Sequence, residues 1–516
     1  MSRLHYVIAT LLAFCLPTLA AAQEVSGFDD RVNQVFADYT SWYVAFIFAP
    51  FPGTDFSWIA LWLVVGAVVF TVYFGAIQFS GFIHSIRLVK GDYSNPDDEG
   101  EVSHFQALAT ALSGTVGLGN IAGVAVAVSI GGAGATFWMI VAGLFGMATK
   151  FTECTLGVKY RNEYPDGSVS GGPMYYMVKG FKEQGLPLGG VMAVVFSVFT
   201  ILGALGGGNM FQANQAHAQI SGVFGEFPGW ITGVVLALLT FAVIAGGLKS
   251  IARVTSRIVP FMGIFYVLVS ILILLINYDQ ILWAFGQIFQ GAFTGLGVVG
   301  GFTGALIQGF RRAAFSNEAG IGSAAIAHSA VRTKEPVSEG YVALLEPFID
   351  TVVICTMTAL VIVISGVLAQ DPDTGLYIWN AELGRIATEG DVGGVALTSA
   401  AYATAFSWFP ILLMVAVVLF AFSTMISWSY YGLKAWTYLF GEGKVKELIF
   451  KTIFCLFIVI GAAASLDPVI DFSDAMLFSM AIVNIIALYF LMPIVKRELH
   501  SYRRRLRSGE IVKNEV

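Results

Sequence analysis

Glycines and polar side chains interrupt an apolar segment at residues 111–123, ALSGTVGLGNIAG. The polar residues are Ser113, Thr115 and Asn120. Glycine destabilises a helix and exposes its backbone, whereas a segment in lipid must satisfy every backbone group within the protein. A helix broken at mid-membrane offers amides to an anion such as a carboxylate, and carbonyls and hydroxyls to a small hard cation such as sodium. The pattern therefore indicates a site for a small ligand or ion.

A second interrupted segment lies at residues 298–329, where glycines and polar residues surround FRRAAFSNEAGIG. At 1.5 Å per residue this stretch and residues 402–433 both exceed the roughly 30 Å apolar core of a bilayer. Each must tilt, break or protrude. Two glycine-interrupted spans at matching positions in two halves of a chain point to a substrate site at the midplane.

The elements that position these breaks are those of an all-α, multi-pass membrane protein. The 516 residues are 57% hydrophobic and 12% charged, against about 25% charged in soluble domains. Glycine, at 57 residues, suggests closely packed helices. Residues 1–22 end in an A-x-A pattern and predict a secretory signal peptide. Apolar runs after residue 22 predict spans at 57–79, 105–128, 132–155, 190–217, 229–247, 257–277, 298–329, 341–368, 402–433, 447–466 and 472–494.

The distribution of lysine and arginine gives these eleven spans a direction. Alternate connections carry almost no basic residues, only Arg31 and Arg385, and residues 370–391 are acidic. The positive-inside rule therefore places the mature N-terminus outside and the basic tail, 495–516, in the cytoplasm. An outside N-terminus is also what a cleaved signal peptide leaves. The basic connections are 80–104, 156–189, 248–256, 330–340 and 434–446.

The span order divides into two sets of five that run in opposite directions, which is the pattern of an inverted repeat. The sets occupy residues 105–277 and 278–494, and each opens with an interrupted span. Residues 23–104 supply an external N-terminal stretch, one accessory span and a cytoplasmic loop. The connection 369–401 is the largest external piece, and residues 281–290 are apolar but too short to span, which suits the outer interface.

Charged residues at membrane depth are further candidates. Opposite-sign pairing within the bundle is expected for Arg311, Arg312 and Glu318 around the second break, and for Glu346 and Asp350, which share a helix face. Lys150 and Glu153 are expected to reach the cytoplasmic interface.

The sequence predicts no cofactor and no enzymatic activity. Neither its cysteines nor its histidines have the spacing of a metal site, and no catalytic arrangement is visible. The GLGNIAG run lacks the strand that a dinucleotide loop requires.

Several longer motifs resemble one transporter family. They are GTVGLGNIAGVA, GGAGATFWMIVAGLFGM at 131–147, SGGPMYYM at 170–177, FSNEAGIGSA at 315–324 and SWSYYG at 427–432. They are similar to the alanine or glycine:cation symporter family, bacterial sodium-coupled amino-acid transporters, over roughly residues 100–500. The resemblance implies the leucine-transporter-type five-plus-five fold of the amino acid/polyamine/cation superfamily, with two broken helices and one extra N-terminal span.

The resemblance also implies roles for the residues around the two breaks. The first break would hold the substrate carboxylate, Gln212 would hydrogen-bond the substrate, and Phe315 would cap a small apolar side chain. Asn317 would meet the ammonium group or the ion, and Trp428 would close the pocket. The substrate set is Thr115, Gly117, Gly119, Asn120, Gln212, Phe315, Asn317 and Trp428, and the sodium ligands are Ser423 and Thr424. Each of these also has a purely structural interpretation as a packing or interhelical contact.

The expected function is sodium-coupled symport of small neutral amino acids, alanine or glycine, across the cell's inner membrane. The expected partners are the amino acid, sodium and the lipid bilayer, with no nucleic acid. A proton-coupled carrier of another small amino acid, and a channel or receptor on the same scaffold, stay open as alternatives. Departures from the family pattern at Ala133, Thr136, Ile140 and Gln308 leave the substrate unsettled, as the sequence leaves the oligomeric state.

Overall fold

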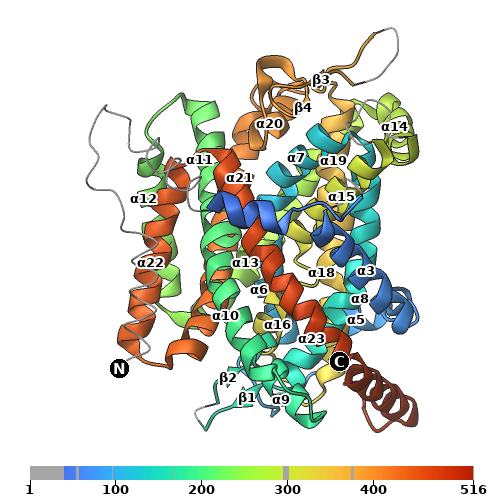
Figure 1. Ribbon diagram of the computed structural model, residues 1–516, viewed down its shortest axis with the longest axis vertical. Coiled ribbons are helices and arrows are strands. Elements are labelled where there is room, and N and C mark those ends of the chain that lie inside the picture. Colours follow the sequence, from blue (N-terminus) through green and yellow to red (C-terminus); the bar gives the residue numbers. More distant parts are fainter. Residues whose placement is uncertain are drawn as a thin grey trace.

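The chain folds into a bundle of helices that is long in one direction (Figure 1). Among the described residues, six helices are long and apolar enough to cross a membrane, and a further such element consists of two helices joined at a bend of 52°. The predicted class of helical membrane protein is confirmed, whereas the number of spans stays a prediction. The computed structural model describes residues 40–53, 57–95, 97–165, 167–294, 301–372 and 377–514. The predicted signal peptide, residues 1–22, lies outside this part of the chain.

The first predicted repeat is mostly helical, and three helices come before it in the sequence. Ahead of it lie α3 (Trp58–Tyr73), α4 (Ile77–Ser80) and α5 (Phe82–Val89). The repeat contains α6 (His104–Thr115), the π-helical turn η1 (Gly119–Gly123), α7 (Val124–Gly131), α8 (Gly134–Lys159), the antiparallel strands β1 (Asn162–Glu163) and β2 (Val169–Ser170), α9 (Pro173–Glu183), α10 (Gly189–Leu205), the π-helical turn η2 (Gly206–Met210), α11 (Phe211–Phe224), α12 (Gly229–Ile244) and α13 (Gly247–Ile276).

The second predicted repeat contains more interruptions. Its elements are η3 (Tyr278–Gln280), α14 (Ile281–Thr294), α15 (Gly301–Asn317), α16 (Ser323–His328), α17 (Pro336–Ala343), α18 (Leu345–Pro347), the π-helix η4 (Phe348–Cys355), α19 (Thr356–Ile364), the antiparallel strands β3 (Trp379–Asn380) and β4 (Arg385–Ile386), η5 (Glu389–Asp391), α20 (Val395–Ala403), α21 (Phe409–Phe440), α22 (Lys444–Ala463) and α23 (Leu466–Ser508).

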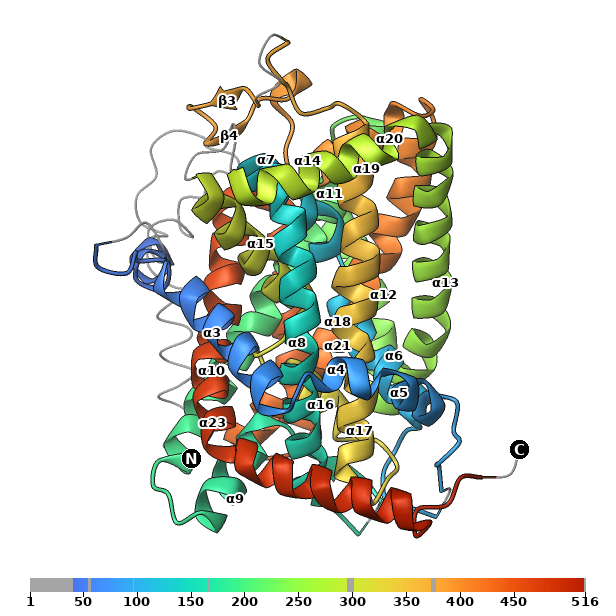
Figure 2. The ribbon, with the colours of Figure 1, turned by 90° about the vertical axis from the view of Figure 1, so that its right-hand side faces the viewer.

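The two broken elements run in opposite directions. In Figure 2, α7 lies above α6, whereas α16 lies below α15. This arrangement agrees with the directions that the charge distribution assigns to these two segments. The five-plus-five repeat as a whole stays a prediction. Of the two long segments, 298–329 breaks between α15 and α16, whereas 402–433 lies mostly within the continuous helix α21.

Glycines allow the helices to pack backbone to backbone. A methyl group on Gly134 of α8 would lie 2.2 Å from the carbonyl carbon of Gly291 on α14. On α12, a methyl group on Gly233 would lie 2.6 Å from the Cα atom of Val459 on α22. The high glycine content therefore serves close helix packing, as expected for a bundle in lipid.

The short apolar segment at 281–290 forms the helix α14, which lies across the upper ends of its neighbours (Figure 2). Leu282 is 85% exposed and Phe289 is 63% exposed, whereas Ala284 and Ile288 are buried against the bundle. A helix with one apolar face in the protein and the other exposed fits a place at a membrane interface.

The last helix extends beyond residue 494, where the sequence predicts that the last span ends and the basic tail begins. α23 continues to Ser508 and bends so that its last part runs along the lower end of the molecule (Figure 2). Pro493 lies inside this helix, where a proline removes a backbone donor and bends the helix. Arg505 in the tail donates to both carboxylate oxygens of Glu335, at 2.6 and 2.5 Å, so the tail is tied to the connection before α17.

Candidate functional site

The first break lies where the glycines predict it. A capping box starts α6: the Ser103 side chain accepts from Gln106 N, and the Gln106 side chain accepts from Ser103 N. The helix ends at Thr115, where the next residue, Val116, has a non-helical ψ of 85°. The chain resumes as η1 and α7 after three residues, at a bend of 52°.

Side chains take up the backbone groups that this break frees. The Gly117 amide donates to Asn120 Oδ1 at 2.8 Å, and the Leu118 amide donates to Gln212 Oε1 at 3.0 Å. Gln212 is itself oriented because its Nε2 donates to the Gly207 carbonyl at 2.9 Å. The Asn120 carbonyl accepts from Thr358 Oγ1 at 2.7 Å. The interrupted backbone is thus satisfied inside the protein, as lipid surroundings require.

The second break separates α15 from α16 through a stretch of left-handed backbone. Glu318 has a φ of 57°, Gly320 of 89° and Gly322 of 90°. Glycine adopts this conformation without strain, whereas a residue with a side chain does so at a cost. The strained residue is therefore Glu318, at the point where α15 ends.

A small cavity lies between the two breaks. The predicted site residues Thr115, Gly119, Gln212, Phe315, Thr424 and Trp428 line it, together with Gly114, Gly207, Glu318 and Leu477. The two breaks approach closely here, because a methyl group on Gly119 would lie 3.2 Å from the Cα atom of Ser316. The cavity therefore brings together residues of α6, η1, η2, α11, α15, α21 and α23, with Glu318 from the second break.

Glu318 is the charged residue of the cavity lining, and it lies outside the predicted substrate and sodium sets. Its side chain is buried, and its Oε1 accepts from Trp428 Nε1 at 2.9 Å. Its Oε2 accepts from Ser323 Oγ at the start of α16. The sequence signal is a charged residue inside the glycine-interrupted segment 298–329, for which pairing with Arg311 or Arg312 is predicted; the structure instead bonds Glu318 to Trp428 and Ser323.

Of the two predicted sodium ligands, Thr424 lines the cavity and Ser423 does not. Thr424 Oγ1 is buried and has no hydrogen-bond partner among the described residues, and it would lie 2.4 Å from a methyl group on Gly117. The Ser423 hydroxyl instead donates to the Phe420 carbonyl at 3.0 Å and does not line the cavity. Thr115 lines the cavity, although its hydroxyl donates to carbonyls of its own helix.

Asn120 and Asn317, both predicted to meet the substrate, do not line this cavity. Asn120 Nδ2 donates to Asp350 Oδ1 at 2.6 Å, and Asn317 Nδ2 donates to Thr351 Oγ1 at 2.9 Å. Each asparagine therefore fastens a break to η4. Gly117 also lies outside the lining, where it allows the close approach of Thr424.

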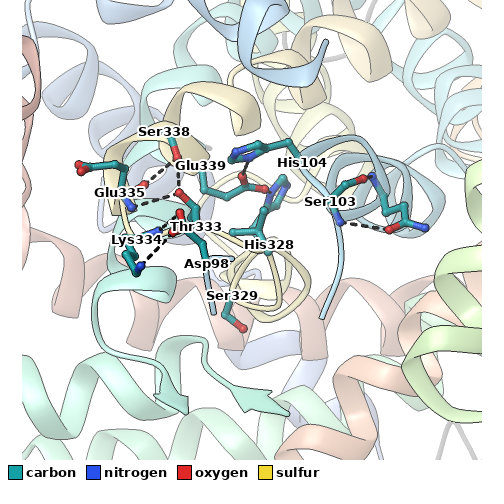
Figure 3. Close-up of polar contacts among 12 residues, drawn as sticks. Asp98, Ser103, His104, His328, Ser329, Thr333, Lys334, Glu335, Ser338 and Glu339 are labelled. Atoms are coloured by element: carbon teal, nitrogen blue, oxygen red, sulfur yellow. Dashed lines mark hydrogen bonds and ion pairs between the residues drawn. The ribbon is translucent and has the colours of Figure 1, made fainter. Parts of the chain in front are cut away.

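A buried network of charged and polar residues lies on the α16 side of the second break. Figure 3 shows His104 and His328 directed at the same carboxylate, that of Glu339, and each nitrogen–oxygen distance is 2.5 Å. Lys150 lies 3.1 Å from Glu346 Oε2, and both side chains are fully buried. The expectation that Lys150 reaches the interface is therefore wrong, because α17 and α18 cover it and supply its counter-charge.

The shared helix face predicted for Glu346 and Asp350 does not lead to a shared partner. Glu346 contacts Lys150 and His328, whereas Asp350 accepts from Asn120 and from Ser316 Oγ at 2.9 Å. The π-helix η4 begins between them at Phe348. A π-helix changes the angular spacing of side chains, so spacing by four in the sequence no longer predicts one direction.

Comparison with known proteins places the chain in one family. A model of the sodium:alanine symporter family matches residues 44–515. The sodium/alanine symporter AgcS of Methanococcus maripaludis is 40% identical over 456 residues, which cover 88% of this chain and 95% of that protein.

Two relatives from Bacillus subtilis also match. The amino-acid carrier protein AlsT is 32% identical, with 88% of this chain and 92% of AlsT covered. The probable sodium/glutamine symporter GlnT is 33% identical, with 79% and 80% covered. All of these relatives are transporters rather than enzymes. The extent of both matches shows that this chain is a transporter and belongs to the sodium:alanine symporter family.

Proposed function

We propose that this protein is a sodium-coupled symporter that carries alanine, or a comparably small neutral amino acid, into the cell by alternating access. One observation carries the proposal: a small cavity lies where two oppositely directed broken helices meet. The name of the relative from Methanococcus maripaludis supports the choice of sodium and alanine.

The lining of the cavity suits an amino-acid zwitterion with a small side chain. Glu318 supplies a buried carboxylate for the ammonium group, and Gly119 and Thr115 present the end of the first break to the substrate carboxylate. Phe315 and Leu477 supply an apolar wall. A long side chain such as that of glutamine would have to displace these bulky groups, so the cavity favours alanine or glycine.

The sodium ion is cargo in this proposal, and Thr424 is its side-chain ligand. A buried hydroxyl without a partner costs free energy unless something binds it. The remaining oxygen ligands would come from backbone carbonyls of the first break, as in other transporters with broken helices. Ser423 is left out of this ion site because its hydroxyl is bound to its own helix.

The two ends of the molecule support a cytoplasmic C-terminus. The β1–β2 hairpin, α9 and the C-terminal tail lie at the lower end in Figure 1, and the β3–β4 hairpin lies at the upper end. The lower end carries the basic connections, and the upper end carries the acidic one. The positive-inside rule therefore assigns the lower end to the cytoplasm of a cell with the protein in its inner membrane.

Uptake by purified protein in liposomes tests the function. An inward sodium gradient should drive saturable accumulation of labelled alanine, and unlabelled glycine and alanine should compete better than glutamine. An equal potassium gradient is the control. Uptake driven by a pH gradient alone would support the proton-coupled alternative, and uptake that neither saturates nor accumulates would indicate a channel.

A further inference from the structure

A buried arginine lies one helical turn away from the cavity. Arg312 on α15 is 1% exposed, and its Nη2 pairs with Asp474 on α23. Its Nε and Nη1 are also buried and have no hydrogen-bond partner in the described part of the chain. A buried guanidinium with unpaired donors costs several times more than a neutral group in the same place, so this site calls for an acceptor.

The position of Arg312 relates it to the path of the substrate. The guanidinium carbon lies 5.2 Å from the centre of the Phe315 ring, one turn further along α15. On the other helix, Asp474 lies three residues before Leu477. Because Phe315 and Leu477 both line the cavity, the Arg312–Asp474 pair forms the next layer, toward the ends at which α15 and α23 begin.

Two arginines share the buried carboxylate of this layer. Asp474 Oδ2 accepts from Arg312 and also from Arg311, whose Nε lies at 2.9 Å and Nη2 at 2.7 Å. One fully buried carboxylate therefore faces two guanidinium groups. Asp471 adds a second carboxylate, but it is 51% exposed and 3.7 Å from Arg311. Because both arginines share one oxygen of Asp474, the Nε and Nη1 groups of Arg312 are left without an acceptor in the described part of the chain.

We propose that the unpaired Nε–H and Nη1–H groups of Arg312 form an anion site that receives the carboxylate of the incoming amino acid before the substrate passes Phe315. This inference rests on the proposed function. A guanidinium binds a carboxylate through charge-assisted hydrogen bonds. The layer thus selects compounds with a free carboxylate before the cavity selects for a small side chain.

Kinetics of alanine uptake in liposomes test the site. In Arg312→Gln, the external KM for alanine should rise about tenfold or more, while the maximal rate changes by less than about twofold. Arg312→Lys keeps the charge and loses the two donors, so its KM should be intermediate; it replaces the glutamine variant if that one does not fold. Arg311→Gln is the matched control, because it removes a neighbouring guanidinium and leaves these donors in place.

Two further measurements identify the anion. Alaninamide lacks the carboxylate, so its inhibition constant should be the same in wild type and Arg312→Gln. Replacement of chloride by gluconate should leave wild-type uptake unchanged. An unchanged KM in Arg312→Gln, an equal loss of affinity for alaninamide, or a chloride dependence that only the wild type shows would each overturn the proposal. A wild type that takes up no amino acid in sodium would instead contradict the proposed function.

Discussion

The indole Nε1 of Trp428 donates a 2.9 Å hydrogen bond to Oε1 of Glu318, and this bond joins α21 to the second helix break. Both side chains are buried and line the same cavity. The bond holds the strained end of α15 against a helix from elsewhere in the chain. Any movement of the break relative to α21 must stretch or replace this contact.

Trp428→Phe should impair transport by keeping the ring and removing the donor. A hydrogen bond to a charged group contributes about 1.5–3 kcal/mol, so we expect a loss of about 10- to 100-fold in uptake efficiency for labelled alanine. Trp436→Phe is the control, because the buried Nε1 of Trp436 on the same helix has no partner among the described residues. Equal effects of both substitutions would show that only the bulk of the ring matters.

Gly117→Ala should impair transport because the new methyl group crowds the backbone of the first break. The new methyl group would lie 2.4 Å from Thr424 Oγ1 and 3.1 Å from Gln212 Oε1, so both side chains must move. We expect sodium-driven uptake to fall by at least about tenfold, at a cost of about 1–3 kcal/mol for the overpacking. Gly123→Ala in the same segment meets nothing closer than 3.9 Å and should transport normally. Normal uptake by the Gly117 variant would show that the close approach has no functional role.

Thr424→Val should raise the sodium concentration that gives half-maximal uptake by about tenfold. The substitution keeps the shape of the side chain and removes an oxygen that has no protein partner in the described structure, so protein stability should change little. The neighbouring Ser423→Ala should leave the sodium requirement unchanged, because that hydroxyl bonds to Phe420. A larger rise in the sodium requirement of the Ser423 variant would show that Ser423, and not Thr424, binds the ion.

Acidification should destabilise the contact between α5 and the C-terminal tail. His84 Nε2 lies 2.8 Å from the Tyr502 hydroxyl, and burial, with help from Arg87 and Arg503, lowers the pKa of His84 to about 4. Because the unfolded side chain has a pKa near 6.5, the unfolded state binds more protons below that pH. The stabilisation is complete above about pH 6.5 and is lost as the pH falls through 4.

Thermal unfolding of the purified protein at pH 7.5, 5.5 and 4.5 measures this effect. His84→Gln should flatten the loss of stability over this range. His500→Gln, at an exposed position on the same tail helix, should unfold as the wild type does. A wild-type melting temperature that does not fall between pH 7.5 and 4.5 would contradict the assignment to His84.

The positions of the two breaks could be predicted from the sequence. Residues 111–123 and 315–324 carry glycines and polar groups inside apolar stretches, and helix propensity and the demands of lipid act on such local patterns. The opposite directions of the two segments followed from where lysine and arginine occur. These features depend on composition and order along the chain, which the sequence displays directly.

Which side chains meet in the cavity was decided only by the tertiary structure. Asn120 and Thr424 are both polar residues beside the first break, yet Asn120 turns to Asp350 and Thr424 faces the cavity. Lys150 lies in an apolar stretch of α8, and its partner Glu346 comes from another helix. Sequence patterns determine where a helix forms and stops, whereas the rotation of each helix, its π-helical turns and its neighbours determine where a side chain points, because those depend on how the helices pack together.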